Sequence, residues 1–124
     1  MAAKKRDYTS YIGRSLSDLL ILGLLQEEED LSGYLIIKKI RKISEGSIKF
    51  RAGTIYPRIE KLYDKGLLTK SVVDETSNGN DAVRQTSTYS LSKLGLQRLQ
   101  EKSMEWYFLQ HKIATILPPM EELQ

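Results

Sequence analysis

The chain has 124 residues, about one domain, with 19 Lys and Arg, 16 Asp and Glu and a formal net charge of +3. Hydrophobic residues make up 40% and charged residues 28%, which excludes a disordered tail, a collagen-like chain and a membrane protein. Cysteine is absent and His111 is the only histidine, which excludes disulfides, zinc fingers, thiol nucleophiles and multi-histidine metal sites. We therefore expect no cofactor and no metal, and the lack of cysteine is compatible with a cytoplasmic location.

The positive charge is concentrated in the middle of the chain. Residues 38–70 contain ten basic and three acidic residues, whereas residues 15–37 contain five acidic residues and no basic one. Residues 1–14 form a second, shorter basic segment. Such clustering is typical of proteins that bind polyanions, although a charge run alone can also be a solvated helix face.

Two helices are expected in the first third of the chain. Ser15 is placed to cap the first one, and residues 16–25 are apolar on nearly all sides, which is typical of a central buried helix. The uninterrupted apolar run within it, Leu19 to Leu25, is shorter than the roughly 20 residues that a membrane span needs. Ser32 is placed to cap the second helix, whose isoleucines share one face, and Gly46 is a suitable stop.

A third helix carries an apolar stripe and several basic residues. It is expected to start near Gly53 or Thr54, to hold Pro57 in its first turn, and to end at Gly66. The stripe has the i, i+4, i+7 spacing of an inward face, and we expect the basic side chains to point away from it. The stripe consists of Ile55, Ile59 and Leu62, and the basic side chains are Arg58, Lys61 and Lys65.

Two strand-like segments follow, over residues 68–74 and 84–91. Between them lies Ser77-Asn78-Gly79-Asn80-Asp81, and Asn-Gly between two such runs is a strong hairpin signal. We therefore expect a β-hairpin after the third helix.

The last helix is expected to be long. Ser92 is placed to cap it, and it runs to about Leu117, before two prolines. Its length of roughly 39 Å exceeds the diameter of about 26 Å expected for such a domain. The helix should extend past its own domain, where its apolar stripe needs a partner such as the same helix of a second copy.

Three helices, a hairpin and a last helix form the element order of a winged helix-turn-helix, whose third helix enters the DNA major groove. We therefore predict a mainly α-helical fold with a small β-hairpin, in which a winged helix-turn-helix precedes a long C-terminal dimerisation helix. Its expected parts are a basic arm over 1–14, the DNA-binding domain over 15–91, the dimerisation helix over 92–117 and a tail over 118–124.

Four short motifs carry a family resemblance. They are Ile21-Leu22-Gly23-Leu24-Leu25, Ser32-Gly33-Tyr34-Leu35-Ile36, Gly53-Thr54-Ile55-Tyr56-Pro57, and Tyr89-Ser90-Leu91-Ser92 with Gly95. The segment from about Ser15 to Trp106 resembles the PadR family of bacterial transcriptional regulators, in its compact subfamily without a separate effector domain. The resemblance implies a homodimer built on the last helix that represses a promoter and is released by a small molecule.

The resemblance also implies which residues meet DNA. It places Thr54, Tyr56 and Arg58 nearest to the duplex, although the position of Tyr56 beside the apolar stripe also suits a core aromatic. We expect Arg58 and Lys61 to contact phosphates, because most protein–DNA hydrogen bonds go to the backbone. The wing departs from the family pattern, since residues 85–89 include no basic residue. The expected DNA-binding set is Thr54, Tyr56, Arg58, Lys61, Lys65, Asn78, Gly79 and Arg84.

Trp106, the only tryptophan, lies on the apolar stripe of the last helix. Two roles remain open for it. It is either a core aromatic of the dimer or, facing its copy across the two-fold axis, one wall of a slot for planar hydrophobic molecules. The expected interface and ligand set is Leu99, Trp106, Leu109, Gln110 and Ile113.

Together these features predict a sequence-specific regulator that binds double-stranded DNA as a homodimer on an inverted repeat, with a planar hydrophobic effector. The alternative is a winged helix used only for protein–protein contact, which gives no reason for the basic middle segment. An enzyme has little support, because the sequence contains no glycine-rich phosphate loop and no paired-carboxylate motif.

Overall fold

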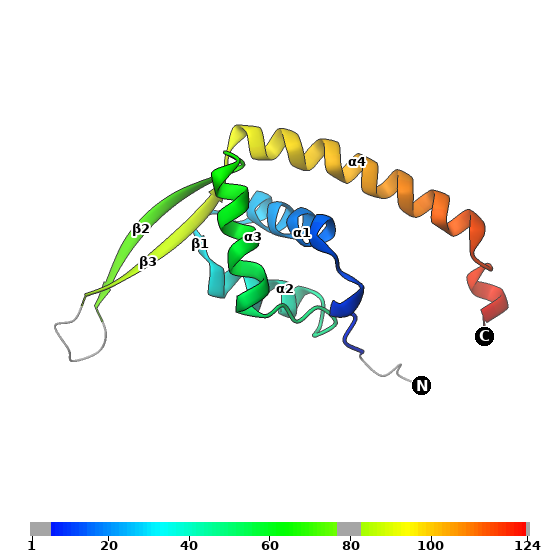
Figure 1. The fold of residues 1–124 in the computed structure, drawn as a ribbon. Coiled ribbons are helices and arrows are strands. Elements are labelled where there is room, and N and C mark those ends of the chain that lie inside the picture. Colours follow the sequence, from blue (N-terminus) through cyan, green and yellow to red (C-terminus); the bar gives the residue numbers. More distant parts are fainter. Residues whose placement is uncertain (1–5, 77–82, 124) are drawn as a thin grey trace.

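The computed structural model of the chain describes residues 6–76 and 83–123 (Figure 1). Its elements follow the predicted order, and the winged helix-turn-helix with a long last helix is confirmed. The helices are α1 (Arg14–Glu27), α2 (Gly33–Ile43), α3 (Ala52–Asp64) and α4 (Lys93–Ile116). The strands are β1 (Leu31–Ser32), β2 (Leu68–Thr76) and β3 (Val83–Leu91), and short 3₁₀ turns occupy Thr9–Tyr11 and Met120–Leu123.

Helix α1 is the centre of the hydrophobic core, as its all-round apolar sequence predicts. Ile21 and Leu25 are at most 1% exposed, and α2, α3 and α4 all pack against this helix. Full burial of such a side chain contributes about 1.5–3 kcal/mol, so this one helix supports a large part of the domain's stability. The surrounding helices contribute Ile36, Ile40, Ile55, Ile59, Leu62 and Leu99.

Two predicted helix caps, Ser32 and Ser92, are confirmed, and the predicted cap Ser15 is wrong. Ser32 Oγ accepts a hydrogen bond from the backbone N–H of Leu35, and Ser92 Oγ accepts one from Gly95. Helix α1 begins before Ser15, at Arg14, and its first turn has no side-chain cap. The hydroxyl of Ser17, which turns back and donates to the carbonyl of Gly13 over 2.8 Å, is the polar group that contacts this end of the helix.

Helix α3 also begins earlier than its sequence suggests. The N–H groups of Thr54 and Ile55 both bond to the carbonyl of Arg51, so the first turn closes before Pro57. Pro57 is therefore inside the helix and not in its first turn as predicted. Because proline has no N–H, the carbonyl of Gly53, one turn earlier, lacks its usual helical donor.

The small sheet has the order β1-β3-β2, with antiparallel pairing throughout. Strands β2 and β3 pair from Leu68–Leu91 to Thr76–Val83 and form the wing. Strand β1 is not expected from the sequence, because two residues are too short for a recognisable pattern. It pairs Leu31 with Tyr89 and so ties the start of α2 to the base of the wing.

Helix α4 starts tightly against this base and then leaves the domain. A Cβ added at Gly95 would lie 2.0 Å from the backbone oxygen of Leu67, so only glycine fits this close approach. The helix has 24 residues, about 36 Å, and its C-terminal half runs past the other helices on the side opposite the wing (Figure 1).

Candidate nucleic-acid interface

Four of the eight predicted DNA contacts are exposed on α3 or directly after it. Ile55, Ile59 and Leu62 are at most 2% exposed and anchor the helix to α1 and α2. The predicted contact residues Thr54, Tyr56, Lys61 and Lys65 are all exposed. The helix thus presents a hydroxyl, an aromatic ring and two ammonium groups to solvent.

The prediction that Arg58 points away from the apolar stripe is wrong. Its guanidinium donates two hydrogen bonds to Asp18 on α1, over 2.9 Å from Nε and 2.6 Å from Nη2. The two side chains are only 15% and 19% exposed. The hydrogen bonds that Arg58 donates to Asp18 raise the pKa of Arg58 above its ordinary value. Arg58 thus joins the third helix to the central helix.

The sequence does contain a signal for this inward orientation. Arg58 comes three residues after Ile55 and four before Leu62, so it lies on the same side of the helix as both. The sequence contains no comparable signal for the partner. Asp18 is 40 positions before Arg58, and its place near the start of a helix suggests a local capping role.

Internal ion pairs involve only some of the basic side chains of residues 38–70. Three of its ten basic side chains form ion pairs, Lys39 with Glu28, Arg58 with Asp18, and Lys70 with Glu60. The other seven are exposed and make no ion pair with any described residue. They lie on α2, on the following loop and on α3, and are Lys38, Arg41, Lys42, Lys49, Arg51, Lys61 and Lys65.

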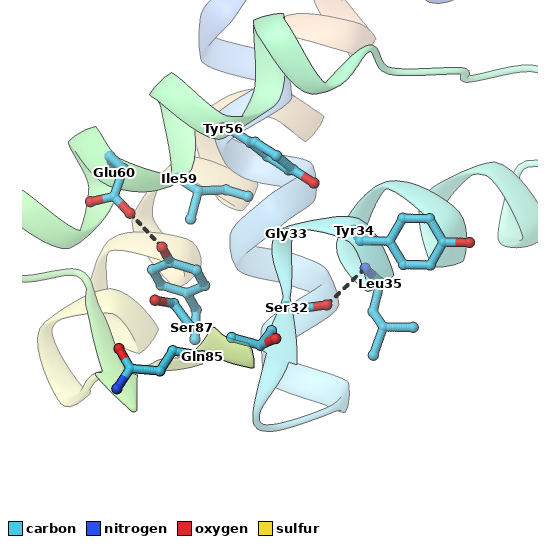
Figure 2. A pocket seen from close by; sticks show the side chains of 11 residues that line it. Ser32, Gly33, Tyr34, Leu35, Tyr56, Ile59, Glu60, Gln85 and Ser87 are labelled. Carbon is cyan, nitrogen blue, oxygen red and sulfur yellow. Dashed lines mark hydrogen bonds between the residues drawn. The ribbon is translucent and has the colours of Figure 1, made fainter. Parts of the chain in front are cut away.

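A groove of about 950 Å³ separates α3 from the wing (Figure 2). The ring of Tyr56 lies over Gly33 at the start of α2, where an added Cβ would come within 2.6 Å of Tyr56 Cε1. Tyr56 is nevertheless 43% exposed. It is therefore both a packing residue between α2 and α3 and a surface residue of the groove, which combines the two roles that the sequence leaves open.

One carboxylate connects α3 to both strands of the wing. The hydroxyl of Tyr89 on β3 donates to Glu60, and Lys70 Nζ on β2 lies 3.0 Å from Glu60 Oε1. The hydrogen bonds from Tyr89 and Lys70 lower the pKa of Glu60, and the bond to Glu60 raises the pKa of Lys70. Burial, and then the bond to Glu60, raises the pKa of Tyr89. This cluster was not predicted, because it depends on how three elements pack.

The comparisons with known proteins agree with this geometry. The model of the Transcriptional regulator PadR-like family matches residues 21–101. The chain belongs to the PadR-like family. Members of this family are transcriptional regulators rather than enzymes, and the winged helix with its basic outer surface is what DNA binding in such a family requires.

Solved structures extend the PadR-like match over most of the chain. A PadR family transcription regulator from Clostridium difficile R20291 is 28% identical, with a TM-score of 0.66, over 82% of this chain and 98% of that one. A PadR-like transcription factor from Bacteroides fragilis is 25% identical, with a TM-score of 0.68, over 87% and 96%. A transcriptional regulator from Clostridium thermocellum, 24% identical, shares the fold with a TM-score of 0.74 over 85% and 93%. No curated protein matches the sequence.

The wing of this PadR-like protein is described only in part. Asn78 and Gly79, two predicted contacts, lie outside the described residues. Arg84, a third, belongs to β3 and is paired in register with Glu75. Val72 and Val73 are 58% and 44% exposed, so this part of the wing offers apolar surface as well as polar groups.

The predicted interface residues of α4 fall into two groups. Leu99 is only 5% exposed and belongs to the core of the subunit, because its half of the helix packs against α1. It is therefore not part of the free stripe that the sequence pattern suggests. Leu109, Gln110 and Ile113 are exposed, and Trp106 is half-buried.

A second cavity of about 530 Å³ lies beside Trp106. It opens between α1, α3 and α4. Its α4 side is formed by Arg98, Lys102, Glu105, Trp106 and Leu109, and Lys65 also lines it. Leucines of α1 and the Asp18–Arg58 pair also line it. Neither Gln110 nor Ile113 belongs to the lining. Across the described ranges, 6–76 and 83–123, there is no acidic or histidine cluster that could hold a metal, and no helix that is long and apolar enough to cross a membrane.

Proposed function

We propose that this PadR-like protein is a repressor that binds an inverted-repeat operator as a homodimer and is released by a planar hydrophobic molecule. The observation that carries the proposal is a set of seven exposed basic residues on α2, in the following loop, and on or directly after α3. None of them forms an ion pair with a described residue. Positive side chains gathered around a recognition helix attract the phosphate backbone, while the helix itself fits the major groove.

In this proposal α3 supplies the main contacts. Thr54 and Tyr56 lie in the N-terminal half of the helix, where base edges come within reach, and Lys61 and Lys65 bind phosphates. Arg58 contributes through Asp18, by holding the helix in place. The proposed set is completed by three wing residues, Asn78, Gly79 and Arg84.

The described part of the basic arm, residues 6–14, contacts the loop between α2 and α3. The backbone N–H of Tyr8 donates to Ser47, and the N–H of Lys49 donates to Thr9 Oγ1, both over 2.7 Å. The arm is thereby attached to the loop that precedes α3. We include it in the proposed DNA-binding surface, because Tyr8 and Thr9 attach it to the loop that carries the exposed Lys49.

The dimer is proposed to form on the helix over residues 92–117. The C-terminal half of α4 exposes large apolar side chains, among them Phe108 at 66% and Ile116 at 83%. Such a stripe is costly in water, and the same stripe of a second copy covers it with two-fold symmetry. Two recognition helices related by that axis fit half-sites about one helical turn apart.

The proposed effector binds beside Trp106. The adjoining cavity combines apolar walls with charged groups, which suits a flat molecule that stacks on an indole. It is bounded by α1, α3 and α4, so an occupant touches both the dimerisation helix and the recognition helix. The effector releases DNA only if it binds more tightly to a dimer whose recognition helices do not match the operator spacing than to the DNA-binding form of the dimer.

Selection from random duplexes tests the DNA-binding part. We expect an enriched inverted repeat whose affinity falls steeply between about 50 and 200 mM salt. Lys61→Ala should weaken binding, and a reporter placed behind the repeat should be repressed. If no sequence is enriched and affinity does not depend on salt, the protein is an interaction module and the proposal fails.

The effector part needs a separate experiment. Planar aromatic compounds are titrated while tryptophan fluorescence and operator release are followed together. Trp106→Ala should abolish both responses in a protein that remains dimeric by sedimentation. If the same compound still releases DNA from this variant, Trp106 is not the sensor.

A further inference from the structure

Glu60 places a carboxylate on the proposed recognition helix, α3. It borders the groove between α3 and the wing, and its side chain is 47% exposed (Figure 2). A negative charge at this place repels phosphates, so on electrostatic grounds alone it weakens DNA binding. Its contacts suggest what it does instead.

The carboxylate of Glu60 holds two residues that face each other across the wing. Lys70 on β2 and Tyr89 on β3 are register partners, and Glu60 accepts hydrogen bonds from both. Lys70 is further held over the ring of Tyr63 on α3, at 4.5 Å from the ring centroid. Tyr89 is 7% exposed and also pairs with Leu31 of β1. The base of the wing is thereby attached to the recognition helix through one side chain.

This attachment matters because the wing is long. Thr76, the last paired residue of β2, is six positions beyond Lys70, which corresponds to about 20 Å of strand. A rotation of about 10° at the base would move that end by about 3.5 Å, given this length. Such a shift exceeds the tolerance of a hydrogen bond, so the angle at the base decides whether wing and helix meet the same half-site.

We propose that Glu60 is a positioning residue for operator binding, which sets the angle between the wing and the recognition helix through Tyr89 and Lys70. The inference rests on the proposed DNA-binding function. Lys70 neutralises the carboxylate, so the groove keeps its attachment without presenting an unpaired negative charge to DNA. Removal of Glu60 should therefore reduce operator recognition even though it makes the protein more positive.

The test compares Glu60→Met with Asp64→Asn. Asp64 lies one turn further along α3, is exposed, and forms no hydrogen bond or ion pair among the described side chains, so it serves as the matched control. Loss of one negative charge near the backbone should tighten binding of Asp64→Asn to any duplex by up to about fivefold. Glu60→Met should weaken binding to the selected operator by about tenfold and leave random duplex unchanged or tighter, so that the ratio of the two affinities falls.

Tyr89→Phe keeps the buried ring and removes only the hydroxyl, and should lower the same ratio by a smaller factor. Each affinity is corrected for the fraction of protein that is folded, which circular dichroism measures. A loss of folded protein lowers the apparent affinity for both duplexes equally, so it leaves their ratio unchanged. If Glu60→Met tightens both duplexes as Asp64→Asn does, or leaves the ratio unchanged, the inference is overturned. If the unaltered protein selects no operator, the proposed function fails and not this inference alone.

Discussion

Replacement of Arg58 by methionine should destabilise the fold, because it leaves Asp18 without its partner. The variant keeps most of the aliphatic volume and removes two hydrogen bonds of 2.9 and 2.6 Å. Breaking a fully buried ion pair costs 3–5 kcal/mol, typically about 4. Here the side chains are 15% and 19% exposed, so water partly solvates the remaining carboxylate and we expect about 2 kcal/mol. For a chain of this length that corresponds to a fall in Tm of roughly 6–10 °C.

Urea unfolding of a mutant cycle measures this effect. Arg58→Met, Asp18→Leu and the double variant should show a coupling free energy of about 2 kcal/mol, since the double variant removes both charges together. Lys61→Met is the control, because Lys61 belongs to the same helix but is exposed and unpaired within the described part of the chain. Its free energy of unfolding should change by less than about 0.5 kcal/mol.

The reasoning would be refuted if Arg58→Met were as stable as Lys61→Met. Operator binding provides a second check on the same proteins. If Arg58→Met keeps its stability and loses DNA affinity, the guanidinium contacts phosphate as the sequence suggests, and its pairing with Asp18 is dispensable.

Three further predictions follow from single sites. Lys61→Ala should weaken binding to all duplexes about equally, and the slope of log affinity against log salt should fall by about one. Gly95→Ala should lower the free energy of unfolding in urea by at least about 3 kcal/mol, because its Cβ would lie 2.0 Å from the backbone oxygen of Leu67. Gly23 has open space around it, so Gly23→Ala should instead raise the free energy of unfolding by about 0.5–1 kcal/mol. The hydrogen bonds that lower the pKa of Glu60 stabilise the fold at pH values above the ordinary pKa of glutamate, where the carboxylate is charged. The difference in free energy of unfolding between the unaltered protein and Glu60→Gln should therefore vanish as the pH falls from about 5 to 3.

Each of these predictions has a clear contrary result. A sequence-dependent loss for Lys61→Ala would indicate a base contact. Equal stability of Gly95→Ala and Gly23→Ala would show that the start of α4 can shift away from β2. A stability difference for Glu60→Gln that persists at pH 3 would show that the carboxylate's charge does not carry the effect.

The sequence by itself determined the four helices and the hairpin of this protein and their order, but not the two-residue strand β1. Apolar residues at helical spacing, serines at Ser32 and Ser92, and glycine after α3 define where helices begin and end, because these signals act between neighbours in the chain. The long last helix follows in the same way from an uninterrupted stripe before two prolines. The recognition-helix residues Thr54 and Lys61 are correctly predicted to be exposed, since their place around the helix depends only on its period.

Only the tertiary structure decided which side chains meet across elements. Arg58 turns inward because α1 brings Asp18 beside it, and Leu99 is buried because the first half of α4 lies against the same helix. The contact of Glu60 with the wing requires the register of β2 on β3 and the angle at which α3 crosses them. Local sequence patterns specify on which side of its own helix or strand a residue lies. Which residue 30 or 40 positions away becomes its partner depends on how the elements pack, and that packing depends on the shape of the whole core.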